Sequence, residues 1–208
     1  MLSMTQGRFW IVRMPRTIVL MLLFLPGCQG SSDGAAELVW GSPGLQAGQF
    51  VRPRGIAVAH PPLPEEVFVV DFAGRIQVFD LDGKYLRGWQ TPTIINGRPG
   101  GIGIAPDGNI LVPDSHYQRL LLYTPTGKLV REIVGTTEHG GLGPFGYISD
   151  VVQDREGSLY IAEFGDANQV RKLTVAGKHL AAFGTAGDGP GQLARPRGLA
   201  LNHRQEIV

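Results

Sequence analysis

Apolar residues after position 47 fall into short runs that are bounded by Gly, Asp or Pro. The runs are rich in Val, Ile, Leu and aromatic residues, which favour extended backbone. No segment after residue 28 places apolar residues at convincing helical spacing over a long stretch. The pattern therefore predicts an all-β chain with strands inside residues 66–71, 75–80, 82–90, 106–114, 119–123, 126–135, 155–163, 169–173 and 176–184.

These strands belong to a repeating unit. The residues Gly55, Gly101, Asp150 and Gly198 occupy one place in it, and they are spaced by 46, 49 and 48 residues. A period just under fifty is typical of β-propeller blades, each a four-stranded antiparallel sheet. The expected blades cover residues 48–92, 93–136 and 137–188, with an incomplete fourth over 189–208.

The amino-acid sequence of the repeating unit resembles that of a known family. The succession GQF-x-x-P-x-GIAV, a strand that ends in Asp, RIQVFD and DGK is similar to the NHL repeat over residues 48–208. The resemblance implies a β-propeller, commonly six-bladed in this family, so we expect the parent protein to be longer than this sequence. The segment EIV at 206–208 aligns with the start of a strand at 66–68, which indicates a fragment. Fold alone leaves function open.

Composition and charge narrow the class of partner. The chain has 30 Gly and 15 Pro, which fits many tight turns. Its formal charge is +1, and removal of residues 1–27 leaves 16 basic and 18 acidic residues. A domain with a net charge near −2 gives no electrostatic reason to expect nucleic acid as a partner.

The N-terminal sequence has the features of an export signal. Arg13 and Arg16 precede an apolar run over 17–25 that is too short to span a bilayer comfortably. The following LPGC ends at Cys28, the only cysteine, and resembles the bacterial lipobox. We therefore expect residues 1–28 to be an export signal with lipidation at Cys28.

This signal predicts a location. Residues 29–47 are small and polar at their start and are expected to form a tether. The predicted protein is an exported lipoprotein, held to a membrane of the bacterial cell envelope by its lipid anchor. Translation starts at Met1 or at Met14, where the second would give a more compact signal.

Four arginines flank the prolines of the RPRG motifs: Arg52, Arg54, Arg195 and Arg197. In a propeller this segment leads into the innermost strand, close to the central channel. Loops on one propeller face are a common place for binding, and arginines there suit an anionic small ligand or an acidic protein. Solvated loop arginines, or pairs with carboxylates of the adjacent blade, are the alternative interpretation.

Acidic residues recur where the second strand of each unit ends. Asp71, Asp114 and Glu163 hold this place. Because a ring of carboxylates in every blade rarely serves one site, we expect each to accept hydrogen bonds from the next turn and to neighbour the following arginine.

No catalytic pattern is evident. Asp114, Ser115 and His116 are adjacent and so cannot form a relay, and the sequence has no HExxH motif or nucleophile elbow. The inner strands offer His60, Asp150, Asp154 and His203 in no recognisable metal arrangement. The sequence thus favours a binding or scaffold module without a cofactor. The alternative is a metal-dependent enzyme of lyase or lactonase type, using calcium or zinc, with catalytic residues partly in missing blades.

Overall fold

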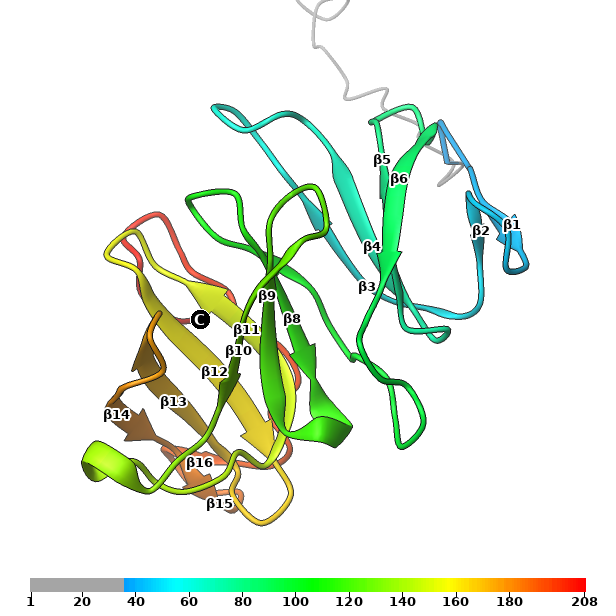
Figure 1. The fold of residues 1–208 in the computed structure, drawn as a ribbon. Coiled ribbons are helices and arrows are strands. Elements are labelled where there is room, and N and C mark those ends of the chain that lie inside the picture. Colours follow the sequence, from blue (N-terminus) through cyan, green and yellow to red (C-terminus); the bar gives the residue numbers. More distant parts are fainter. Residues whose placement is uncertain (1–35) are drawn as a thin grey trace, which may run out of the picture. The chain divides into compact units, whose positions relative to one another are not determined.

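Residues 36–208 are described by the computed structural model, and nearly every regular element in them is a strand (Figure 1). Leu38–Val208 forms one compact unit. The expected export signal and the lipidation site at Cys28 lie outside the described residues. In the described part of the chain, the two helices are short 3-10 turns, η1 (Ser115–Tyr117) and η2 (Glu138–Gly140), and neither can span a membrane.

Three four-stranded antiparallel sheets follow one another along the chain, and in each the strand order equals the sequence order. Blade 1 contains β3 (Pro53–Val58), β4 (Val67–Asp71), β5 (Arg75–Phe79) and β6 (Tyr85–Gln90). Blade 2 contains β7 (Gly103–Ile104), β8 (Ile110–Asp114), β9 (Arg119–Tyr123) and β10 (Leu129–Val134). Blade 3 contains β11 (Tyr147–Gln153), β12 (Ser158–Phe164), β13 (Gln169–Thr174) and β14 (His179–Phe183).

These sheets confirm the all-β prediction and the placement of three repeats. The incomplete fourth repeat is also folded back on itself. The backbones of Ala200 and Val208 exchange two hydrogen bonds, of 3.1 and 2.9 Å, and Leu201 is bridged to Ile207. This antiparallel pairing is the beginning of a fourth sheet.

The core lies between successive blades. Strand β8 is buried along its whole length and contributes to both interfaces by the two-residue alternation of a strand. Ile110 and Val112 pack in the cluster shared with blade 1, which includes Phe68. Leu111 packs in the cluster shared with blade 3, which includes Ile161. A central strand that is covered on both faces has to be apolar at nearly every position, as β8 is.

The hairpin turns use glycine as the sequence suggests. Gly83, Gly108 and Gly157 have φ values of +82°, +86° and +88°. Each donates its N–H to the carbonyl three residues earlier, at 2.9–3.1 Å. A side chain at such a φ is strained, so these positions explain part of the high glycine content.

The segment before blade 1 is more ordered than a tether. The Trp40 ring lies 4.6 Å from Phe79 and 6.0 Å from Phe50, between ring centroids, in an apolar cluster of blade 1. Strand β1 (Ser42–Pro43) pairs in parallel with β2 (Gln49–Phe50). The expected boundary at residue 48 therefore comes too late, because Trp40 already packs on the blade.

The same loop appears again before the fourth repeat. Strand β15 (Thr185–Ala186) pairs in parallel with β16 (Gln192–Leu193), in the register of β1 and β2. The sequence carried a signal for this: Gly41 and Gly44 match Gly184 and Gly187 in their spacing to the GQ pair, with φ values of +88° and +148° against +86° and +146°. The repeat thus begins seven residues earlier than the GQF motif.

Buried carboxylates fasten these loops to the blades. Asp71, which is fully buried, accepts the N–H groups of Val51 (3.1 Å) and Ala73 (3.0 Å) and pairs with Arg75 at 2.5 Å. Arg75 in turn donates to loop carbonyls, including that of Gln49 at 3.0 Å. For Asp71 this confirms the structural interpretation, with a hydrogen bond from the next turn and a pair with the following arginine.

Blade 3 reaches the same result with exchanged residues. Glu163 pairs with Arg171, and it accepts the side chain of Gln169 and the N–H of Gly146 (2.8 Å). Arg171 donates to the carbonyl of Gly143 at 2.7 Å, in the loop before the blade. Blade 1 has Arg first and Gln two residues later, whereas blade 3 has Gln first and Arg second.

Removal of Trp40 should loosen the start of blade 1. We expect Trp40→Ala to lower the free energy of unfolding by about 2 kcal/mol, less than for a fully buried aromatic because Trp40 is half-buried. Leu38→Ala, at a site 53% exposed, is the control and should change it by less than about 0.5 kcal/mol. Chemical denaturation followed by circular dichroism measures both. Equal effects would show that Trp40 belongs to a tether after all.

Loss of the blade 3 arginine should be more costly. Arg171→Met leaves the fully buried Glu163 without its charge partner, so we expect a loss of about 3 kcal/mol or more in the free energy of unfolding. Arg131→Met, on the exposed outermost strand β10, should stay within about 0.5 kcal/mol of the parent. A small effect of Arg171→Met in the same denaturation assay would contradict the role of this pair.

Candidate functional site

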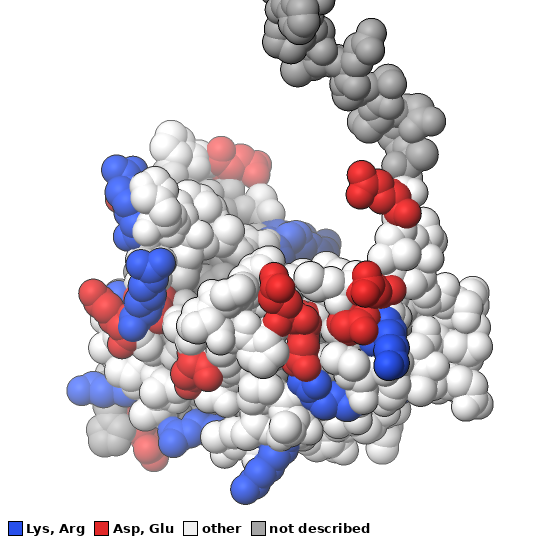
Figure 2. Space-filling model, turned by 90° about the horizontal axis from the view of Figure 1, so that it is seen from above, with Lys and Arg blue, Asp and Glu red and all other residues white. Residues whose placement is uncertain are grey.

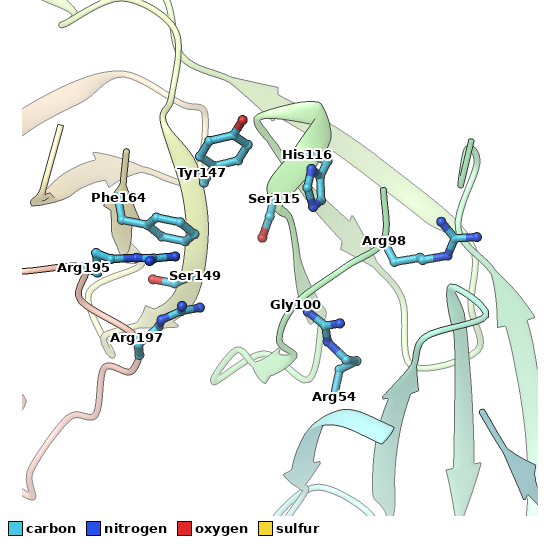
Figure 3. Close-up of a pocket in the computed structure, with 10 residues that line it drawn as sticks. All are labelled: Arg54, Arg98, Gly100, Ser115, His116, Tyr147, Ser149, Phe164, Arg195 and Arg197. Carbon is cyan, nitrogen blue, oxygen red and sulfur yellow. The ribbon is translucent and has the colours of Figure 1, made fainter. Parts of the chain in front are cut away.

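A pocket of about 350 Å³ lies where the inner strands begin, and ten residues line it (Figure 3). They come from all three blades and from the start of the fourth repeat. They are Arg54, Arg98, Gly100, Ser115, His116, Tyr147, Ser149, Phe164, Arg195 and Arg197. Four of the ten are arginines and none is acidic, so the pocket is strongly cationic.

The lining follows the repeat. Gly55, Gly101, Asp150 and Gly198 occupy one place in the repeat. The residue just before that place is Arg54 in blade 1, Gly100 in blade 2, Ser149 in blade 3 and Arg197 in the fourth repeat. All four residues line the pocket. The small residues of the two middle repeats leave open the space that separates Arg54 from Arg197. Two of the four residues at this place of the repeat are therefore small and two are arginines.

Two phenylalanines hold the arginines. Phe72 and Phe164 each follow the strand-ending acid of their blade. The guanidinium carbons of Arg54 and Arg98 lie 5.6 and 4.8 Å from the centroid of the Phe72 ring. Cation–π contact of this kind orients a guanidinium without neutralising it.

The second cluster has the same design. The guanidinium carbons of Arg195 and Arg197 lie 5.2 and 5.0 Å from the centroid of the Phe164 ring. Among the described residues, no salt bridge joins Arg54, Arg195 or Arg197 to an acidic side chain. Arg98 is more constrained, because its Nε donates to the carbonyl of Phe72 at 2.8 Å.

The remaining walls are polar or aromatic. The Tyr147 ring lies 5.6 Å from His116 and 5.5 Å from Phe164, between ring centroids. The Ser115 hydroxyl donates to the carbonyl of Ile148, and the Ser149 hydroxyl donates to the carbonyl of Pro196 at 2.7 Å. Both hydroxyl protons are thus engaged, which leaves the serine oxygens as acceptors.

Asp150 follows the lining residue Ser149 directly, but its carboxylate has a structural role. Its carboxylate accepts the N–H groups of Val151 and Leu199, both at 2.9 Å, and so joins blade 3 to the fourth repeat. Burial raises the pKa of the Asp150 carboxyl above its usual value, although these two amides act in the opposite direction. Blade 1 has glycine here because the inner strands approach closely: a Cβ on Gly55 would lie 3.0 Å from the Cα of Gly101.

Three of the four arginines that the sequence indicated as ligand-binding residues lie together in the pocket. Arg54, Arg195 and Arg197 line one pocket, whereas Arg52 lies outside its lining and stacks on Phe72 at 5.2 Å. Arg98 was missed by the sequence interpretation, although RPGG at 98–101 is a variant of the RPRG motif.

The acidic and histidine residues considered as metal ligands are dispersed. His60 lines a different cavity, His203 is exposed, and Asp154 accepts hydrogen bonds from its own turn and from Tyr160 (3.1 Å). Within residues 36–208, no three His, Cys, Asp or Glu side chains gather as a metal site.

The charges on one outer face contrast with the pocket. Figure 2 shows that both acidic and basic side chains are spread over this face, with several acidic side chains close together near its middle. The four arginines of the pocket are thus a local concentration of positive charge in a domain of mixed charge.

Comparisons with known proteins support the fold. Neither a scan against protein-family models nor a search of curated proteins gives a match. Among solved structures, virginiamycin B lyase from Staphylococcus aureus is similar with a TM-score of 0.56 and 18% identity. A streptogramin B lyase (TM-score 0.55, 16% identity) and the WD40 repeats of RRP9 (TM-score 0.51, 13% identity) are also similar.

The coverage is unequal. The three matches include 75%, 74% and 76% of this chain but 47%, 46% and 42% of the matched chains. The chain therefore spans about half the length of these structures. Together with its sheets, this likeness defines the fold as a β-propeller, here three blades and the beginning of a fourth.

Proposed function

We propose that the chain is part of an exported, lipid-anchored β-propeller of the NHL type that binds an anionic ligand through its arginine pocket. The observation that carries the proposal is the lining itself, with four arginines and no acid among ten residues. The ligand is a small molecule or the acidic segment of a protein. Binding occurs at the loops of one propeller face, where ligand sites on rigid scaffolds often lie.

The physical basis is the state of the guanidinium groups. A guanidinium presents several N–H donors in a planar fork that fits a carboxylate or a phosphate. Contact with Phe72 and Phe164 restricts the arginines before a ligand arrives. Because less side-chain freedom is then lost on binding, more of the interaction energy is available as affinity.

The proposed location rests on the sequence alone. The segment TIVLMLLFLPGC at 17–28 has the length of a signal and ends in the sole cysteine. A lipid on Cys28 would hold the blades close to a membrane in the cell envelope.

Inorganic phosphate is a suitable first probe. We expect the full-length chain, purified in a non-ionic detergent, to bind phosphate in isothermal titration calorimetry. Arg197→Gln should weaken this binding roughly tenfold or more, since a hydrogen bond to a charged group is worth about 1.5–3 kcal/mol. Arg131→Gln, exposed on β10, is the matched control and should bind as the parent does. Equal binding of phosphate by all three proteins would overturn the proposal. So would a parent chain that binds neither phosphate nor any of the organic anions named in the next subsection.

An enzyme is the second candidate, and His116 favours it. His116 lies in the lining, and a histidine is a common general acid or base near neutral pH. Among the similar structures is a catalytically inactive histidine-to-alanine variant of the Staphylococcus aureus lyase with quinupristin, at 17% identity.

The two candidates are separated by turnover and metal content. If the chain is a binding module, incubation with quinupristin or with a panel of lactones should leave each compound unchanged by mass spectrometry. Elemental analysis of the purified chain should then find no stoichiometric calcium or zinc. Turnover that disappears in His116→Ala would favour the enzyme.

A further inference from the structure

We propose that the ligand of this pocket is a polyhydroxylated dianion, with one anionic group at each end and hydroxyl groups between them. This inference rests on the proposed function and names the class of ligand. It covers sugar diacids and sugar bisphosphates, which share this chemistry.

The pocket has two cationic ends. Figure 3 shows Arg54 on one side of the cavity and Arg195 and Arg197 on the opposite side, with Gly100 and Ser115 between them. The first side is held by Phe72 of blade 1 and the second by Phe164 of blade 3. A ligand with a single anionic group would satisfy one end and leave the other end without a counter-charge.

The residues in the middle of the pocket are small or polar, because the middle repeats differ from the outer ones at two positions. At the place where the outer two repeats have Arg54 and Arg197, blades 2 and 3 have Gly100 and Ser149. Blade 2 also has Ser115 where blades 1 and 3 have phenylalanine. The body of a ligand thus has room between the two charged ends, in a cavity of about 350 Å³.

The serine oxygens specify what that body carries. The hydroxyl of Ser115 donates to the carbonyl of Ile148, and that of Ser149 donates to Pro196. Since each proton is used within the protein, each oxygen can only accept a hydrogen bond from the ligand. A hydroxyl group on the ligand is a donor of the required kind, whereas a third carboxylate would be repelled by the two oxygens.

Matched probes test the two ends and the middle separately. Glucarate, gluconate and adipate have six carbons each: glucarate is a hydroxylated dianion, gluconate lacks one charge, and adipate lacks the hydroxyl groups. Glucose 1,6-bisphosphate and glucose 6-phosphate form the corresponding phosphate pair. Titration calorimetry on the full-length chain in a non-ionic detergent, at constant ionic strength, gives the affinities.

We expect at least one dianion to bind at least tenfold more tightly than its monoanion, because the second end is engaged within one molecule. The affinity for glucarate should also be several-fold higher than the affinity for adipate. Arg54→Gln and Arg197→Gln should each bring the dianion close to the affinity of its monoanion. Ser149→Ala should weaken glucarate but not adipate, and Arg131→Gln should change none of them. Thermal melts of each variant establish that it is folded.

The outcomes distinguish this inference from the proposed function. If phosphate binds and each dianion binds no more tightly than its monoanion, the inference fails while the proposed function stands. Equal affinity for glucarate and adipate overturns the hydroxylated body. If neither phosphate nor any dianion binds, both proposals fail.

Discussion

The structure depends on a buried carboxylate at the end of the second strand of each blade. Asp71, Asp114 and Glu163 are fully buried, and each is paired with an arginine of the next strand. A buried charge without a partner would be very costly, so the pair has to form wherever the blade forms. In blades 1 and 3 the arginine also donates to carbonyls of the loop that enters the blade. The loop is thereby fixed, and with it the start of the inner strand.

That constraint separates the structural arginines from the pocket arginines. Arg75 and Arg171 have carboxylate partners and little exposure, so their guanidinium groups have a structural role. Arg54 and Arg197 come one residue before Gly55 and Gly198. They stack on aromatic rings and form no salt bridge in the described residues. The same residue type therefore has two roles, and its partner decides which one it has. Arg75 and Arg171 hold the loops that enter their blades, and the pocket forms where Arg54 and Arg197 follow such loops.

The sequence was sufficient for the elements and their order because the signals are local. Apolar runs, glycine turns and a period near fifty residues specify strands and blades without knowledge of long-range contacts. The contact of Trp40 with Phe79 was not predictable in this way, since nothing local indicates that a residue in a polar segment packs 39 positions away. The replacement of Arg75 by Arg171 was hidden for a similar reason. The two residues occupy different places in the repeat, and only the folded sheet shows that each reaches the strand-ending carboxylate of its own blade, Asp71 or Glu163.

The pocket was predictable from the sequence only in part. The RPRG motifs indicated its arginines, but their convergence depends on residues that looked unremarkable, namely Gly100 and Ser149. Four guanidinium groups around one cavity repel each other, which costs stability in the absence of a counter-charge. A bound anion removes that repulsion and stabilises the folded state by mass action. Cation–π contact with Phe72 and Phe164 offsets part of that cost, because the electron-rich ring faces attract the guanidinium groups. An acidic residue in either place would have relieved the repulsion permanently and closed the site to an anion.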